Sequence, residues 1–332
     1  LKDSGILDSN PNRDRIGVVW GSGIGGLNTF QEEAKNYFGS DGPPRLNPFF
    51  IPKMIADMAA GQISIKHELR GPNYVTVSAC ASATNALIDS FNLIRLGKSD
   101  AIVTGGSEAC VNEMGMGGFN ALRALSTRND SPQTASRPFD VDRDGFVLGE
   151  GSGALILEEY EHAVKRGANI YAEVIGSGMS ADAYHMTAPH PEGLGAMNTM
   201  LSALDDANIT PADVDYVNVH GTSTPLGDVA EVKAIQSVFG EKAYDLNISS
   251  TKSMTGHLLG AAGAIEAIAC VMAVKEDIVP PTINHFTDDP NLDPKLNFTF
   301  NKAEKRTVNI ALSNTFGFGG HNTSVIVKKY KP

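Results

Sequence analysis

Short apolar runs alternate with amphipathic segments along most of the chain. The runs rich in Val, Ile, Leu and Ala predict strands at residues 16–20, 75–79, 101–106, 153–159, 171–176, 215–221, 246–250, 308–314 and 323–329. Between two of these runs, Ala83, Leu87, Phe91 and Ile94 recur at helical spacing before Gly97. Strands that alternate with helices are typical of parallel βαβ units, so we predict an α/β fold.

Two further helices are predicted in the second half of the chain. Met197, Met200, Leu201 and Leu204 form an apolar stripe. The stretch 210–213, "TPAD", is typical of a helix start, because a hydroxyl can cap the helix, proline fits its first position and an acid suits its positive end.

Two patterns occur twice in the chain. "VTVSACASATNAL" (75–87) and "NISSTKSMTGHLLGAAGAI" (247–265) each combine an apolar strand, a turn of small polar residues and a helix rich in small residues. "GEGSGALILEEYE" (149–161) and "GFGGHNTSVIVKKY" (317–330) each lead from glycines into a strand with a charged exit. Both pairs are about 170 residues apart, which indicates an internal duplication. We therefore predict two halves, 1–163 and 164–332.

Composition narrows the class of protein. The 332 residues are 42% hydrophobic and 20% charged, enough for a large core. A net charge of -11 disfavours nucleic acid as a partner. The sequence has no run of about 18 apolar residues, so we do not expect a membrane partner. Cys80, Cys110 and Cys270 are an odd number at wide spacing, which argues against a disulfide framework or a zinc site. They favour a reducing compartment, the cytoplasm.

Two motifs imitate ligand sites. "WGSGIGG" contains G-x-G-x-x-G at Gly21, Gly23 and Gly26, but residues 36–50 have three prolines and no strand where a dinucleotide fold needs a second strand and an acid. We interpret these glycines as a closely packed turn. In "DVDRDGFVLGEG" (140–151) the acids imitate a calcium loop whose last position falls on Gly151 instead of an acid. We predict turn carboxylates that bind backbone amides and arginines.

Candidate chemistry centres on a cysteine and two histidines. Cys80 lies where a predicted strand meets a predicted helix, and the positive helix end is expected to lower the pKa of its thiol. His220 and His257 each follow a strand among small residues, so both are predicted to face one crevice at the carboxyl ends of parallel strands. A Cys-His-His set of this kind suits thioester chemistry. Cys110, Cys270 and the remaining histidines are interpreted as structural or surface residues.

Long blocks of the chain resemble one enzyme family. They are "ACASA" (79–83), "RALSTRND" (123–130), "ASRPFDVDRDGFVLGEGSGALILEEYEHA" (135–163), "VHGTSTPLGD" (219–228), "STKSMTGHLLGAAGA" (250–264) and "NTFGFGGHN" (314–322). In order and spacing they resemble the elongating β-ketoacyl-[acyl carrier protein] synthases of the thiolase superfamily, most closely the synthase II branch of fatty-acid synthesis. The resemblance implies a thiolase fold, two βαβαβαββ halves in five αβαβα layers, and a homodimer without a cofactor or metal. It also leads us to expect that about 80 of the family's first residues are absent here.

The resemblance implies a role for each matching residue. Cys80 would take an acyl group from an acyl carrier protein, and malonyl carrier protein would then lose carbon dioxide and condense with that group. His220 and His257 would bind the malonyl thioester carbonyl, and the amides of Cys80 and Phe318 would stabilise the oxyanion. The supporting residues implied are Lys252 with Glu266 behind the second histidine, Thr187, Thr222 and Thr224 at the pantetheine arm, Phe316 beside the site, and Ile24 and Phe50 along an acyl tunnel that crosses the dimer interface.

Other interpretations stay open. Ala188 replaces a serine common in the family, and Arg45, Lys53, Arg123 and Arg128 are the candidates for docking the acidic carrier protein. A polyketide ketosynthase would use the same three residues. A non-catalytic chain-length partner subunit lacks the nucleophile, so the presence of Cys80 favours an enzyme.

Overall fold

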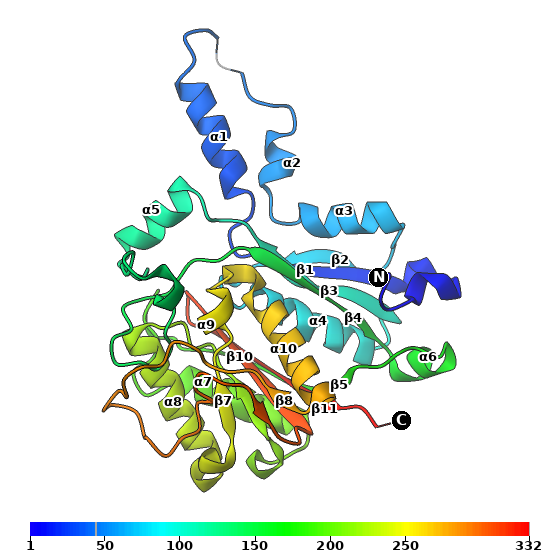
Figure 1. Cartoon of the computed structure of the whole chain (residues 1–332). Coiled ribbons are helices and arrows are strands. Elements are labelled where there is room, and N and C mark those ends of the chain that lie inside the picture. Colours follow the sequence, from blue (N-terminus) through cyan, green and yellow to red (C-terminus); the bar gives the residue numbers. More distant parts are fainter. Residues whose placement is uncertain (44, 332) are drawn as a thin grey trace.

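Two β-sheets form the frame of the molecule (Figure 1). The computed structural model describes residues 1–43 and 45–331. The first sheet has the order β2 (Asn73–Thr76), β1 (Ile16–Gly21), β3 (Ala101–Glu108) and β4 (Gly151–Glu158). The second has the order β5 (Ala172–Ala181), β11 (His321–Lys329), β10 (Ile310–Gly317), β6 (Tyr216–Asn218) and β7 (Asn247–Ser249). Every strand predicted from the sequence is present, with shifted ends.

Helices lie between the sheets and on their outer faces. Between the sheets are α4 (Ser82–Arg95) and α10 (Ala262–Glu276), α3 (Met58–His67) covers the first sheet, and α7 (Leu194–Asp206) and α8 (Pro225–Phe239) cover the second. This order confirms the predicted five αβαβα layers. The other elements are α1 (Leu27–Phe38), α2 (Phe50–Met54), α5 (Glu113–Ala121), α6 (Tyr160–Lys165), α9 (Lys252–Thr255), a small sheet of β8 (Ile278–Val279) and β9 (Glu304–Lys305), and 3-10 turns at Ile6–Ser9, Arg13–Arg15, Pro132–Thr134, Pro211–Asp213, Gly240–Asp245 and Leu259–Ala261.

The strand order repeats the duplication predicted from the sequence. β2, β1 and β3 are parallel and β4 is antiparallel to β3, while β7, β6 and β10 are parallel and β11 is antiparallel to β10. The second sheet adds β5 beyond β11. The carboxyl ends of matching strands therefore meet at the same edge of the molecule. The predicted division of the chain at residue 163 falls within α6, which follows β4 and precedes β5 in the sequence. This division stays a prediction.

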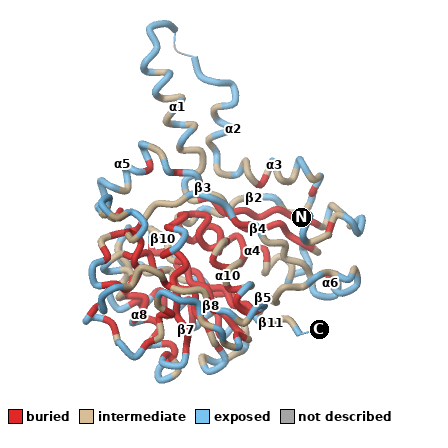
Figure 2. The backbone as a smooth tube through the Cα atoms, viewed as in Figure 1, coloured by how far each residue is buried: buried red, intermediate tan, exposed pale blue. Residues whose placement is uncertain are grey.

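Buried residues concentrate in the strands of the two sheets and in the helices packed between them (Figure 2). Small residues let α4 and α10 approach closely: a Cβ added at Gly263 would lie 1.9 Å from the Thr84 hydroxyl oxygen. A Cβ at Gly21 would lie 2.4 Å from the Ala83 nitrogen, and one at Gly26 would lie 2.2 Å from the Lys53 carbonyl oxygen. These distances confirm that the G-x-G-x-x-G glycines serve close packing.

Two local predictions were wrong. The strand expected over 75–79 ends at Thr76, because the chain turns before the helix and Ala79 has a φ of 50°. The helix expected from Thr210 is only the 3-10 turn Pro211–Asp213, in which the Asp213 carboxylate accepts hydrogen bonds from the Thr210 amide and hydroxyl. A β-strand follows that turn within a few residues and leaves no room for a helix.

The carboxylates of 140–144 bind backbone groups, as predicted. Asp140 accepts the amides of Phe286 and Thr287 at 2.7 and 2.9 Å. Asp144 accepts the amide and hydroxyl of Thr127. The acidic turn thus joins segments of the fold that are distant in sequence.

Candidate active site

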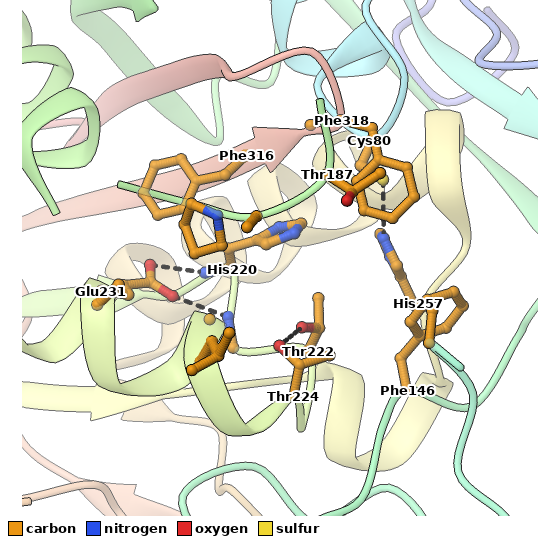
Figure 3. Close-up of a pocket in the computed structure, with 18 of the residues that line it drawn as sticks. Cys80, Phe146, Thr187, His220, Thr222, Thr224, Glu231, His257, Phe316 and Phe318 are labelled. Carbon is orange, nitrogen blue, oxygen red and sulfur yellow. Dashed lines mark hydrogen bonds between the residues drawn. The ribbon is translucent and has the colours of Figure 1, made fainter. Parts of the chain in front are cut away.

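A cavity of about 420 Å³ opens where the carboxyl ends of the strands meet. Cys80 reaches it from the turn before α4, His220 from the loop after β6 and His257 from the loop after α9. Phe316 and Phe318, at the turn between β10 and β11, line it as well (Figure 3). The crevice predicted for the cysteine and both histidines is therefore present.

Cys80 is held in a tight turn against the opposite half of the chain. It lies two residues before α4, directly after Ala79 with its positive φ. A Cβ at Gly317 would lie 2.6 Å from the Ser78 carbonyl oxygen and 3.2 Å from the Cys80 nitrogen. The turn between β10 and β11 thus packs directly on the cysteine turn, and only glycine fits there.

The predicted shift of the cysteine pKa was wrong in direction. Burial raises the pKa of the Cys80 thiol to about 12, although Lys252 and the backbone amide of Phe318 lower it. The thiol is 8% exposed, so desolvation of the thiolate outweighs the helix end. Its sulfur lies 3.0 Å from His257 Nε2 (Figure 3). A neutral thiol beside a neutral imidazole is the resting pair.

His220 is oriented through its backbone. The Glu231 carboxylate accepts the amides of His220 and Gly221, each at 2.8 Å. Burial raises the pKa of Glu231 to about 7. Burial, with the charge of Lys252, lowers the pKa of His220 well below its usual range. The imidazole is therefore neutral at pH 7 and can donate a hydrogen bond.

His257 is fixed on the facing side of the cavity. Its ring lies edge to face with Phe146 at 5.2 Å and with His220 at 5.3 Å between centroids. Its amide donates to the Val147 carbonyl at 2.7 Å. Burial and the charge of Lys252 lower the pKa of His257 well below its usual range. Both histidines thus line the cavity as neutral rings, and His257 contacts the sulfur.

Lys252 and Glu266 lie behind the cavity as a buried ion pair. The lysine Nζ donates to Glu266 Oε1, and both side chains are at most 2% exposed. The Thr315 hydroxyl donates a hydrogen bond to Glu266 and accepts one from the Thr84 hydroxyl on α4. The pair therefore links the two halves of the chain.

The other predicted residues divide into two groups. Thr187, Thr222 and Thr224 line the cavity mouth, and the hydroxyls of Thr222 and Thr224 are 3.0 Å apart. Ile24 and Phe50 do not line this cavity: Ile24 is 44% exposed, and the Phe50 ring stacks on Phe30 at 6.4 Å. Phe50 begins α2, in the segment of α1 and α2 that projects from the body (Figure 1). Ile24 lies in the turn between β1 and α1, where its amide donates to Glu108 of β3.

Glu231 and Phe146 were not predicted from the sequence. Glu231 is an acid in an otherwise largely apolar stretch of α8, eleven positions after His220. Its apolar surroundings were the only feature of the sequence that could have indicated a role for this carboxylate. Phe146 lies in the block "DRDGFVLGEG", where the acids drew attention instead.

Neither a metal centre nor a membrane-spanning helix is found among the described residues. Within residues 1–43 and 45–331, no group of three or more His, Cys, Asp or Glu side chains is arranged to hold a metal ion. In the same residues, no helix is both long and apolar enough to span a membrane.

Comparison with known proteins defines the family. The family model of the β-ketoacyl synthase N-terminal domain matches residues 1–163, and that of the C-terminal domain matches residues 171–286. A 3-oxoacyl-[acyl-carrier-protein] synthase 2 of Staphylococcus aureus is 53% identical over 98% of this chain and 78% of its own length. One of Synechocystis is 50% identical over the whole chain and 79% of its own length. The chain belongs to the β-ketoacyl synthase family.

Solved structures share the fold. A ketosynthase of a type II polyketide synthase, determined in complex with its acyl-carrier protein, has a TM-score of 0.94 and 34% identity, covering 99% of this chain and 82% of its own. A β-ketoacyl synthase of Burkholderia phymatum has a TM-score of 0.89 and 38% identity, covering 96% of this chain and 76% of its own. The five layers described above are the thiolase fold of these enzymes.

Proposed function

We propose that the chain condenses an acyl thioester with malonyl-[acyl carrier protein], giving a 3-oxoacyl-[acyl carrier protein] two carbons longer and carbon dioxide. The observation that carries this proposal is the 3.0 Å contact of Cys80 with His257 beside the second neutral histidine, His220. The names of the relatives at 50% and 53% identity support it.

The first half-reaction is acyl transfer. The Cys80 sulfur attacks the thioester carbonyl, its proton moves to the leaving carrier thiol, and the acyl group stays on Cys80. The thiol is neutral at rest, so His257 at 3.0 Å is the group placed to receive the proton during attack. The amides of Cys80 and Phe318 would donate hydrogen bonds to the oxyanion, and the Phe318 amide already reaches the Cys80 sulfur.

The second half-reaction forms the carbon-carbon bond. Loss of carbon dioxide from the malonyl carboxylate leaves an enolate, which attacks the acyl carbonyl on Cys80. The carbon-sulfur bond breaks, and the released thiolate takes a proton from water. His220 and His257 donate hydrogen bonds to the enolate oxygen, and their lowered pKa values keep them neutral donors. Lys252 supports this state, because its charge opposes protonation of both rings.

The carrier protein would approach the mouth of the cavity. Thr187, Thr222 and Thr224 line that mouth and would bind the pantetheine arm. Of the four basic candidates, Arg123 lines the cavity itself, whereas Arg45 and Lys53 lie on the projecting segment and Arg128 donates to the Asp142 carbonyl. Arg123 is therefore our first choice for contact with an acidic carrier.

A homodimer is the expected assembly, and its interface would involve the first sheet. β2 forms the edge of that sheet, and Val77 just beyond it is 63% exposed. The projecting segment exposes Phe38 at 84% and Phe49 at 63%. An open sheet edge beside exposed apolar side chains suits pairing with a second copy. Ile24 and Phe50 would then line the acyl tunnel across the interface.

A charge at this edge is expected to separate the dimer. Val77→Lys should shift sedimentation from twice 35.2 kDa toward 35.2 kDa, because the lysine would be desolvated in the interface. Leu201→Lys, at a 44% exposed position of α7 on the outer face of the other sheet, is the matched control and should remain dimeric. A wild-type chain that sediments as a monomer at micromolar concentration would refute the assembly.

The cytoplasm is the location we propose. Cys80, Cys110 and Cys270 are free thiols, which supports a reducing compartment. Cell fractionation with an antibody to the chain tests this directly.

A polyketide ketosynthase is the second candidate, favoured by the fold match with a TM-score of 0.94. Primer choice separates the two. We expect octanoyl carrier protein with malonyl carrier protein to give the 3-oxodecanoyl product, detected by mass, at a higher kcat/KM than an unreduced 3-oxooctanoyl primer. Preference for the 3-oxo primer would favour the polyketide reaction, and no product from either primer would refute condensation.

A further inference from the structure

The acidic turn at 140–145 takes no part in the chemistry proposed above, yet it packs against the loop that carries His220. The Gly145 amide donates to the Ser223 carbonyl at 3.0 Å. The side chain of Arg143, in the same turn, is 3% exposed and does not line the cavity. A buried arginine outside the site but beside a catalytic loop suggests an indirect role.

The Arg143 guanidinium joins its own turn to two other segments, 224–228 and the loop at Asp289. Nη1 donates to the Asp140 carbonyl at 2.8 Å and to the Asp289 carboxylate at 2.6 Å. Nε donates to the Thr224 carbonyl at 3.3 Å and lies 3.4 Å from Asp228 Oδ2, and Nη2 donates to the Pro225 carbonyl at 3.0 Å. Two carbonyls of the 220–225 loop are therefore held by one planar fork.

That loop needs such a tether because its backbone is strained. Ser223 has a φ of 70°, a conformation that costs about 1 to 3 kcal/mol for a residue with a side chain. Its amide donates to Asp228 at 3.2 Å, and Asp228 is fixed by Arg143. The residues on either side, Thr222 and Thr224, point their hydroxyls toward each other at the cavity mouth (Figure 3). Without the Arg143 contacts, the 220–225 loop would relax and the Thr222 and Thr224 hydroxyls would move.

We propose that Arg143 is a positioning residue for substrate binding, which holds the Thr222 and Thr224 hydroxyls where the pantetheine arm of a carrier-bound thioester enters. This inference rests on the proposed function. The arm binds alike before and during the reaction, so loss of this positioning raises KM and leaves kcat nearly unchanged. Lysine keeps the charge but lacks the fork that spans both carbonyls.

Arg143→Lys is the test, and Arg137→Lys is its matched control. Arg137 lies in the same segment and is 7% exposed, but its guanidinium binds Thr134 and Asp140 and stacks on Phe286 instead of reaching the loop. With octanoyl carrier protein as varied substrate, we expect Arg143→Lys to raise KM about tenfold, the size of one lost hydrogen bond, with kcat within about twofold. Arg137→Lys should leave KM within about twofold.

A milder variant covers the case in which Arg143→Lys does not fold. Asp289→Asn leaves the fork in place and removes its charged anchor, so KM should rise by an intermediate factor. The alkylation rate of Cys80 by iodoacetamide, which needs no pantetheine site, should be unchanged in every variant. Equal effects of Arg143→Lys and Arg137→Lys, or a loss confined to kcat, would overturn the inference.

A second readout separates this inference from the proposed function. The concentration of octanoyl-pantetheine that half-saturates acylation of Cys80 is measured by intact mass without any condensation. If the wild type is acylated but does not condense, the proposed function fails, and a tenfold higher half-saturation for Arg143→Lys still supports the inference. If that concentration is the same in both proteins, or the wild type is never acylated, the positioning role is refuted.

Discussion

Replacing Cys80 with alanine is expected to lower the condensation rate by on the order of a thousandfold or more, because no other group can carry the acyl chain. Incubation with octanoyl carrier protein should add one acyl group to the wild-type mass and none to Cys80→Ala. The substitution removes one sulfur from a buried turn, so the variant should remain folded by circular dichroism, with a loss of stability of about 1 kcal/mol.

The chain offers its own controls for this result. Cys110 and Cys270 are also buried, and desolvation raises the pKa of each thiol, as it does for Cys80. What distinguishes Cys80 is the imidazole at 3.0 Å and its place at the cavity. Cys110→Ala and Cys270→Ala should therefore still be acylated. Acylation that persists in Cys80→Ala and disappears in Cys110→Ala would show that Cys110, and not Cys80, is the nucleophile.

Glu266→Gln is expected to destabilise the fold by about 3 to 5 kcal/mol, because it leaves the buried Lys252 ammonium without its counter-ion. Urea unfolding at pH 7 and 25 °C measures this loss. Glu304→Gln is a matched change of an acid that pairs with asparagines near the small sheet, and it should cost much less. A loss below about 1 kcal/mol for Glu266→Gln would show that the Lys252 ammonium finds another partner or reaches solvent.

The double variant Lys252→Met, Glu266→Leu separates stability from chemistry. A buried ion pair replaced by apolar groups of similar size is often neutral, so we expect stability to return within about 2 kcal/mol of the wild type. Condensation should be impaired, because the Lys252 charge, which adds to burial in lowering the pKa of both histidines, is gone. A double variant with full activity would leave Lys252 a structural role only.

The sequence predicted the fold well because the repeated signals were strong. Apolar runs located every strand of the two large sheets, and the two repeated patterns predicted matching strand orders. β8 and β9 were missed since each has two residues, too short for any periodicity. The strand before Cys80 was predicted to extend too far, because nothing in "VTVSA" reveals that Ala79 adopts a positive φ beside the packed turn at Gly317.

The sequence predicted which three side chains would meet at one cavity, but not their electrostatics. Cys80, His220 and His257 met in one cavity as expected. The thiol pKa moved the other way, because the degree of burial depends on the packing of both halves and is invisible in a local motif. Glu231 was missed for a related reason: its partners are backbone amides, which carry no sequence signal.

The crossing of α4 and α10 also bears on how such an enzyme could arise. Matching turns of the duplicated halves face each other across this crossing, and one supplies the cysteine while the other supplies Lys252 and His257. Two halves of the chain that share the same turn pattern thus provide different catalytic groups. Neither half can now be exchanged for the other, and selection must act on both together to keep the 3.0 Å contact between sulfur and imidazole.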